Sequence, residues 1–326
     1  LHSDRVYRVE PVRFATGLRL ATLLSPAWLL RRLPRSMLDN APLVETLRHW
    51  VDLRDIERAV AEQALLGLAI TASSYTSGTH WTFCQVGAGI RPEPWRRPGR
   101  RAPFQPVGHD HLLASSAIPI IFPAVSLQVD GHPEFFGDGS MRQISPLSPA
   151  MNLGATRILA IGVGQPQRSG LGLMTPSTAG QIHYPPLAQI GSHAMASVFH
   201  DTLAADVEQA QRVNESLARI PPGLGGMLPY RPVSILSIQP SHSLDALALQ
   251  HLRALPLQAF RLLKMLGGTQ GAGAALASYL LFEPPFVQAL IGLGRRDAIE
   301  RRQEIERFFL PASDTSHVND RHPTVP

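Results

Sequence analysis

The chain has 326 residues, of which 44% are hydrophobic and 17% are charged, and it carries a net charge of +5. This length allows one large domain or two of ordinary size, and the composition excludes a largely disordered chain. Lys264 is the only lysine among 30 basic residues, so nearly all of the positive charge is arginine. Because the arginines are scattered and no nucleic-acid recognition motif occurs, we expect no nucleic-acid partner. A GC-rich coding sequence is the preferred explanation of the arginine bias, ahead of contact with anionic lipid headgroups.

The start of the chain and its single cysteine bear on the cellular compartment. The sequence begins with Leu1 and shows no signal peptide, and its longest early apolar stretch without charge, residues 20–30, is too short to span a bilayer. We therefore expect that the true start lies upstream and that the protein is cytoplasmic. Cys84 is the only cysteine, which rules out an intramolecular disulfide, and its alternating surroundings favour a buried structural thiol over a nucleophile.

Residues 11–33 are apolar, with interspersed arginines and Pro26 between two halves. Two interpretations fit this pattern. The favoured one is a pair of helices packed in the core. The other is a segment that lies on a membrane surface with its arginines at the lipid headgroups. Peripheral membrane contact therefore stays open at this point.

Residues 39–103 predict a helix, a hairpin and a loop. Asp39 or Asn40 caps the helix, and Pro42 lies in its first turn. Residues 65–75 form a continuous apolar run, as expected for a strand covered on both faces. A Ser-Gly turn then leads into an alternating strand, which completes a β-hairpin. The Pro/Arg-rich residues 93–103 are predicted to be a solvated loop. The helix positions expected to pack are Leu43, Leu47 and Trp50.

Residues 109–164 predict a second hairpin between two helical segments. A short helix from His109 is broken by Pro119 and leads to an extended apolar stretch that ends at Pro123. The hairpin over residues 126–139 follows, and its return strand delivers Asp138. A helix then ends at Gly154, and residues 156–164 form a short buried strand. This β-helix-β order favours parallel pairing with a right-handed crossover.

Beyond residue 164 the pattern becomes mainly helical. It predicts a Gly/Pro-rich loop, an amphipathic helix over residues 192–217, one strand within residues 231–241, and helices through Phe309. A disordered tail is expected over residues 311–326. We therefore divide the chain into residues 1–164, a mainly helical extension over residues 165–310, and the tail.

Two segments resemble the bacterial patatin-like phospholipases. Residues 111–123, HLLASSAIPIIFP, match the Ala-Ser-x-Ala-x-Pro-x-x-Phe-Pro block of that family. Residues 135–149, FFGDGSMRQISPLSP, match its strand ending in Asp-Gly and the Pro-Leu-x-Pro helix start that follows. The strand RILAIGVG comes next in the same order, and a looser likeness extends over most of the chain.

The resemblance implies a three-layer α/β/α domain, incomplete at its N-terminus, with a helical C-terminal extension. It also implies a serine esterase with a Ser-Asp dyad, in which Asp138 is the base and Gly139 and Ser140 complete the Asp-Gly motif. A serine hydroxyl needs such a base, and a carboxylate can serve if it is partly desolvated and within hydrogen-bond reach. The implied substrate is a lipid ester in lipid catabolism, and no cofactor or metal is expected.

The sequence departs from the family at the nucleophile. No G-x-S-x-G elbow and no Gly-rich oxyanion loop occur, so we expect both upstream of Leu1 and expect this chain alone to be inactive. The nearest mimic, GGTQG with Thr269 at its centre, follows a helical pattern and is interpreted as a helix break. Ser140 stands where the family has Gly or Ala, and a residue this small is expected to be tolerated.

Other polar residues carry weaker hypotheses. His109-Asp110-His111 lacks a third metal ligand and is interpreted as a surface turn. Ser115 and Ser116 lack a glycine elbow and are expected at a helix start or in packing. The competing function is a non-catalytic lipid- or partner-binding protein on the same fold.

Overall fold

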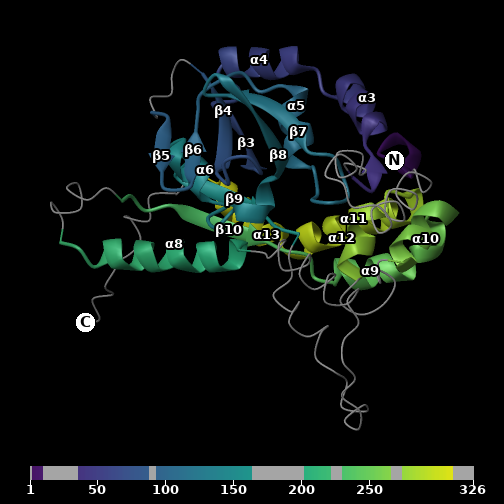
Figure 1. Cartoon of the computed structure of the whole chain (residues 1–326). Coiled ribbons are helices and arrows are strands. Elements are labelled where there is room, and N and C mark those ends of the chain that lie inside the picture. Colours follow the sequence, from purple (N-terminus) through teal and green to yellow (C-terminus); the bar gives the residue numbers. More distant parts are fainter. Residues whose placement is uncertain are drawn as a thin grey trace, which may run out of the picture.

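The computed structural model describes residues 2–9, 36–87, 93–163, 202–221, 230–265 and 274–310. In these residues the protein is a mixed α/β structure built around a six-stranded sheet (Figure 1). β4 and β6 pair in parallel, and the other neighbouring strands pair antiparallel. The α/β class is confirmed. Across the sheet the strands are β5 (Trp95–Arg97), β6 (Arg100–Ala102), β4 (His80–Val86), β3 (Gly67–Ser74), β8 (His132–Asp138) and β7 (Val125–Val129).

Both predicted hairpins are present. β3 and β4 pair over their length, and Gly78 takes a positive φ of 67° in the turn between them. β7 and β8 are joined by Asp130 and Gly131, with φ values of 50° and 85°. Positive φ at both central residues is the requirement of the two-residue turn that Asp-Gly favours. This turn fixes the register of the hairpin, which places Asp138 at the end of β8.

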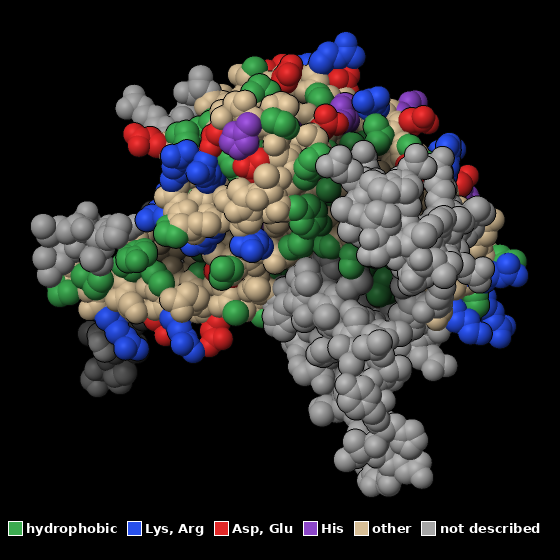
Figure 2. All heavy atoms as spheres, in the orientation of Figure 1, with side chains coloured by type: hydrophobic (Ala, Val, Ile, Leu, Met, Phe, Trp, Pro, Cys, Tyr) green, Lys and Arg blue, Asp and Glu red, His purple; other side chains and the backbone are tan. Residues whose placement is uncertain are grey.

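The prediction of a solvated loop over the Pro/Arg-rich segment is wrong, because that segment forms the hairpin β5–β6. Gly99, at a φ of 68°, lies in its turn. Arg96 is opposite Arg101, and Arg97 is opposite Arg100. Pairing with β4, rather than an apolar face, defines these short strands, so hydrophobic periodicity could not reveal them. Arginine side chains gather over this hairpin (Figure 2).

One face of the sheet is covered by α5 (His109–Ser115), which packs on a buried cluster. Trp81 stacks on Phe83 with ring centroids 5.9 Å apart, and Phe136 meets both rings edge-on. Cys84 is buried on β4, which agrees with its predicted structural role, and burial raises the pKa of its thiol to about 12. The buried members of the cluster are Ile70, Ala72, Trp81, Phe83, Val107, Ala114, Leu127, Val129 and Phe136.

The segment after α5 turns instead of extending. The helix ends before Pro119, as predicted, but the N–H of Phe122 donates to the carbonyl of Ile118 at 2.9 Å. Ile120 takes a φ of 69°, a left-handed conformation that is unfavourable for a β-branched residue. Its carbonyl accepts from the N–H of Met37 at 2.9 Å. The apolar residues here therefore turn toward the N-terminal segment and do not form the extended stretch that we expected.

The predicted parallel strand has a different partner from the one expected. β9 (Arg157–Ile161) follows α6 (Ser148–Asn152), and Gly154 lies between them at a φ of 103°. β9 pairs in parallel with β10 (Ser234–Ile238), not with β8. Since β3 and β7 occupy both edges of β8, no edge of β8 is left for β9. β9 is only partly buried, because Ile158 and Ala160 are buried while Ile161 is 74% exposed.

α8 (Leu203–Ala218) connects β9 to β10 in the chain order and packs on this two-stranded sheet. Its predicted apolar positions Leu203, Val207 and Ala210 belong to the same buried cluster as Ile158 and Ala160. The helix stripe predicted from the sequence is therefore confirmed over the described part of α8.

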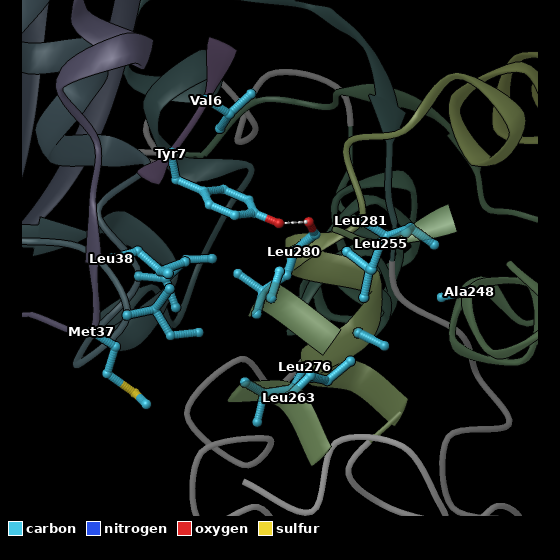
Figure 3. Close-up of a cluster of buried hydrophobic side chains, with 14 of the residues drawn as sticks. Val6, Tyr7, Met37, Leu38, Ala248, Leu255, Leu263, Leu276, Leu280 and Leu281 are labelled. Atoms are coloured by element: carbon cyan, nitrogen blue, oxygen red, sulfur yellow. Dashed lines mark hydrogen bonds between the residues drawn. The ribbon is translucent and has the colours of Figure 1, made fainter. Parts of the chain in front are cut away.

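The C-terminal helices pack with the N-terminal segment (Figure 3). The Tyr7 hydroxyl donates to the carbonyl of Leu280 at 2.8 Å, and Ile118, Ile121 and Phe122 join the same buried cluster. None of the helices in the described ranges is long and apolar enough to cross a bilayer. The helices are α9 (Leu244–Gln250), α10 (Leu257–Met265), α11 (Ala274–Leu280), α12 (Pro284–Glu300) and α13 (Arg302–Phe309), with the 3-10 turns η1 (Ser3–Arg5) and η6 (Leu252–Ala254).

The N-terminal part also contains the pair β1 (Arg8–Val9) and β2 (Leu38–Asp39), followed by α3 (Ala41–Trp50) and α4 (Leu53–Ala61). α3 begins after Asn40 with Pro42 in its first turn, as predicted. Trp50 is 56% exposed, so this end of the predicted apolar stripe is not packed.

Several sequence predictions fall outside the described residues and stay predictions. These are the arginine-interspersed segment 11–33, the 164/165 boundary, the first part of the 192–217 helix, the GGTQG segment with Thr269, and the tail 311–326.

Candidate functional site

Asp138 lies where β8 ends and the 3-10 turn η2 (Gly139–Arg142) begins. Its backbone pairs with Ala72 of β3, and its N–H donates to the carbonyl of Ala117 at 2.9 Å. Ala117 belongs to the segment after α5, so both segments of the patatin-like resemblance meet at this residue. The side chain is half-buried.

The glycines on either side of Asp138 make room for the protein's own packing. A Cβ atom on Gly137 would overlap the ring of Tyr75. One on Gly139 would overlap the backbone and hydroxyl of Thr71 on β3. Packing therefore requires glycine on both sides of Asp138. Gly137 makes room for Tyr75, the residue that follows β3, and Gly139 makes room for Thr71 of β3.

Ser140 determines how one oxygen of Asp138 is used. The backbone N–H and the hydroxyl of Ser140 both donate to Asp138 Oδ1, at 2.8 Å and 2.6 Å. Asp138 Oδ2 accepts no hydrogen bond from a described residue. The serine at this position was expected only to be tolerated, but it holds the carboxylate in place and leaves one oxygen available.

Burial raises the pKa of the Asp138 carboxyl, and the two hydrogen bonds from Ser140 oppose this shift without cancelling it. Burial also raises the pKa of the Tyr75 hydroxyl, and the negative charge of Asp138 adds to this effect. A carboxylate with a raised pKa and an open oxygen is better able to accept a proton than a fully hydrogen-bonded one.

The other residues named from the sequence have local structural roles. Ser116 follows α5, and its hydroxyl donates to the carbonyl of Leu112 at 3.0 Å, while Ser115 is the last helical residue. They lie at a helix end, so the expected helix-start role is wrong. His111 Nδ1 accepts from the N–H of Gly108 at 2.9 Å.

His109 Nε2 lies 2.9 Å from the carbonyl oxygen of Val51, so this histidine ties α5 to the residue after α3. Among the described residues, no group of histidine, cysteine and acidic side chains is arranged to hold a metal ion. The His-Asp-His sequence forms the first turn of α5, and both histidines are half-buried, so the interpretation as a surface turn is wrong.

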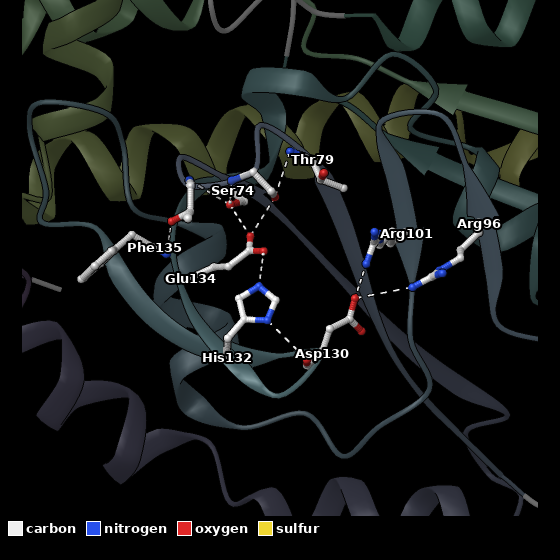
Figure 4. Close-up of polar contacts among 10 residues, drawn as sticks. Ser74, Thr79, Arg96, Arg101, Asp130, His132, Glu134 and Phe135 are labelled. Carbon is white, nitrogen blue, oxygen red and sulfur yellow. Dashed lines mark hydrogen bonds and ion pairs between the residues drawn. The ribbon is translucent and has the colours of Figure 1, made fainter.

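A second carboxylate on β8 lies in a polar cluster that sequence reasoning missed (Figure 4). Glu134 is 4% exposed. Its Oε2 accepts from the hydroxyls of Ser74 at 2.5 Å and Ser77 at 2.8 Å, and its Oε1 lies 3.2 Å from His132 Nε2. Burial acts to raise the pKa of Glu134, but these hydrogen bonds outweigh it and hold the pKa below the usual range.

Ser74 is fully engaged in this cluster. Besides donating to Glu134, its hydroxyl accepts from the N–H groups of Thr76 and Ser77, both at 3.0 Å. The Ser74–Glu134 pair therefore fastens the β3–β4 turn to β8 and is not a nucleophile with its base. An available signal was the position of Glu134 in phase with Phe136 on an alternating strand, since an inward-pointing carboxylate requires donors.

In comparisons with known proteins, no family model matches the chain, and no curated protein matches it either.

Proposed function

We propose that this chain carries the general base of a lipid acyl hydrolase of the patatin-like type, with Asp138 as that base. The observation that supports this most is the state of the carboxylate, which is half-buried, has a raised pKa and accepts no hydrogen bond at Oδ2 from a described residue. Asp138 also lies where the two sequence segments that resemble the family meet, which supports its assignment as the base.

In the proposed reaction, a serine from residues upstream of this sequence attacks the carbonyl carbon of a lipid ester. Asp138 Oδ2 accepts the serine proton, and that proton passes to the departing alcohol as the ester C–O bond breaks. Asp138 then takes a proton from the water that attacks the acyl-serine, and it returns this proton to the serine oxygen as the acyl C–O bond breaks and the fatty acid leaves. Ser140 keeps Oδ1 occupied throughout, so the same oxygen serves both steps.

Asp138→Asn tests this proposal in a longer chain that includes the upstream serine. The amide keeps the size of the side chain but cannot accept the serine proton, so we expect the hydrolysis rate to fall by about 10²–10⁴. Asp130→Asn is the matched control, because Asp130 is the other Asp-Gly of the β7–β8 hairpin and Asn-Gly serves that turn equally well. A folded Asp138→Asn enzyme with full activity would end the assignment.

The competing function, a non-catalytic binding protein, has one observation on its side. The hydroxyl that contacts Asp138 belongs to Ser140 of the same turn, not to a serine elbow. A serine-directed phosphonate separates the two functions. We expect no labelling of the present chain and one labelled upstream serine in the longer chain, whereas no labelling of either would favour the binding protein. Stoichiometric labelling of Ser140 would contradict the upstream nucleophile.

A further inference from the structure

The hairpin β5–β6 sends its four arginines to two sides. Arg96 and Arg101 are opposite each other in the register, and both approach the carboxylate of Asp130. Arg97 and Arg100 form the neighbouring register pair, and successive side chains of a strand point to opposite sides. Neither of these two forms an ion pair with a described residue. Within the described part of the chain their charges therefore have no acidic partner, in contrast to those of Arg96 and Arg101.

Arg97 and Arg100 line a pocket of about 140 Å³. Most of its wall comes from the hairpin, from β4 and from the segment before and within α6, and none of the described residues that line it is acidic. A volume of 140 Å³ is below the roughly 300–1,000 Å³ of pockets for larger organic ligands. The main polar side chains around it are His80, Thr82, Arg97, Arg100, Gln143 and Ser148.

His80 gives a second, independent indication that this pocket takes a ligand. It lies on β4 opposite Arg100 and is 5% exposed, yet its Nδ1 has no hydrogen-bond partner among the described residues. Burial, aided by the charge of Arg100, lowers its pKa to about 4, so its ring is neutral near pH 7. A buried polar atom without a partner costs free energy and calls for an acceptor or donor from outside.

The remaining polar groups of the pocket are also suited to an anion. The Thr71 hydroxyl donates to Gln143 Oε1 at 3.3 Å, which leaves the amide nitrogen of Gln143 to donate elsewhere. Ser148 accepts from Asn152 at 3.0 Å and keeps its own hydroxyl proton for a ligand. Two guanidinium groups, an amide and a hydroxyl offer more donors than the two oxygens of a carboxylate can use, and they match a tetrahedral oxyanion.

We propose that this pocket, between the β5–β6 hairpin, β4 and α6, binds a phosphate group. The site is separate from the carboxylate of Asp138, which is in phase with Phe136 on the face of the sheet that α5 covers. The inference therefore goes beyond the proposed hydrolysis and does not depend on it. Two sources present this chemistry: the headgroup of an anionic phospholipid, and free phosphate or a soluble phosphate ester.

The test measures binding and not hydrolysis. Inorganic phosphate is titrated into the chain by calorimetry, and phosphatidic acid vesicles are assayed by co-sedimentation with phosphatidylcholine vesicles as the reference. Arg97→Gln and Arg100→Gln are compared with Arg96→Gln, which removes the same charge from the adjacent position on the other side of β5. Circular dichroism and thermal unfolding confirm that each variant is folded.

We expect Arg97→Gln and Arg100→Gln each to weaken binding about tenfold or more, and Arg96→Gln to leave it within about twofold. Saturable binding of inorganic phosphate with this pattern assigns a soluble source. The same pattern with phosphatidic acid vesicles alone assigns a lipid headgroup. An equal loss in all three variants would reduce the effect to surface charge and overturn the proposal, as would the absence of binding in both assays.

Discussion

The two carboxylates of β8 lie four residues apart on the same strand and are in opposite states. Glu134 is buried and accepts hydrogen bonds from Ser74 and Ser77, and its pKa is lowered. Asp138 is half-buried, its side chain receives donors from Ser140 only among the described residues, and its pKa is raised. Burial acts in the same direction on both. The comparison teaches that the pKa of a carboxylate follows the balance of two effects: hydrogen bonds from three side chains outweigh desolvation at Glu134, and desolvation outweighs the two bonds from Ser140 at Asp138.

The largest expected effect comes from removing the satisfied carboxylate. Glu134→Ala removes the acceptor of two hydroxyls, of which Ser74 is buried and Ser77 is exposed to water, and a buried unsatisfied group costs about 1–3 kcal/mol. We expect the free energy of unfolding to fall by about 1–3 kcal/mol, measured by urea denaturation. Glu134→Gln keeps one acceptor oxygen and should lose less. Equal losses for the two variants would show that the hydrogen bonds are not what stabilises this turn.

The pH dependence of stability should have opposite signs at the two residues. Because the pKa of Glu134 is lowered in the folded state, ionised Glu134 raises the free energy of unfolding. This stabilisation is complete above the ordinary glutamate pKa and is lost as pH falls through the folded-state pKa. Because the pKa of Asp138 is raised in the folded state, ionised Asp138 lowers the free energy of unfolding. This destabilisation is complete above the folded-state pKa and disappears as pH falls through the ordinary aspartate pKa.

Unfolding of the wild type, Glu134→Gln and Asp138→Asn across the acidic range measures this contrast. The stability advantage of the wild type over Glu134→Gln should shrink as pH falls, while its stability relative to Asp138→Asn should rise. Parallel changes in the two differences would mean that global charge, and not the two local environments, controls the acid response.

The sequence was sufficient for the features carried by strong local patterns. The hairpin predicted over residues 126–139 corresponds to β7–β8, and the helix end predicted at Gly154 corresponds to the end of α6. Two features depended on tertiary context and were missed. β9 pairs with β10, since both edges of β8 are occupied by other strands. The hairpin β5–β6 forms where β6 pairs with β4.

The candidate site was predicted in position but not in detail. Asp138 was identified from its neighbours in the sequence, and the glycines beside it do permit close approach, although to Tyr75 and β3. Nothing in the sequence pattern showed that the hydroxyl of Ser140 would occupy Oδ1, because a hydrogen bond to a turn serine depends on the side-chain rotamer. The Glu134 cluster was missed although alternation places Glu134 in phase with Phe136, because its serine donors come from the end of β3 and the β3–β4 turn, far away in the sequence.

Asp138→Asn should affect stability much less than Glu134→Ala. The amide oxygen can still accept both bonds from Ser140, so we expect a change within about 1 kcal/mol near neutral pH. Chemical denaturation of the purified variant checks this. A loss as large as that of Glu134→Ala would place Asp138 with the structural carboxylates.

Ser140→Ala should produce the smallest change in stability while moving the pKa of Asp138. Loss of the hydroxyl hydrogen bond removes one of the two interactions that lower this pKa, so the pKa should rise further. Ser116→Ala is the control, because its hydroxyl donates to carbonyls of α5 and not to a carboxylate. An unchanged Asp138 pKa in Ser140→Ala would remove Ser140 from the site.

A carbon-13 NMR titration of the side-chain carboxyls of Asp138 and Glu134 in the present chain tests the contrast most directly. The signals are assigned by their disappearance in Asp138→Asn and Glu134→Gln. We predict that Asp138 titrates above the ordinary aspartate pKa and Glu134 below the ordinary glutamate pKa. An Asp138 pKa at or below the ordinary value would contradict the account, because the carboxylate would then be held as a structural acceptor and not as an available base.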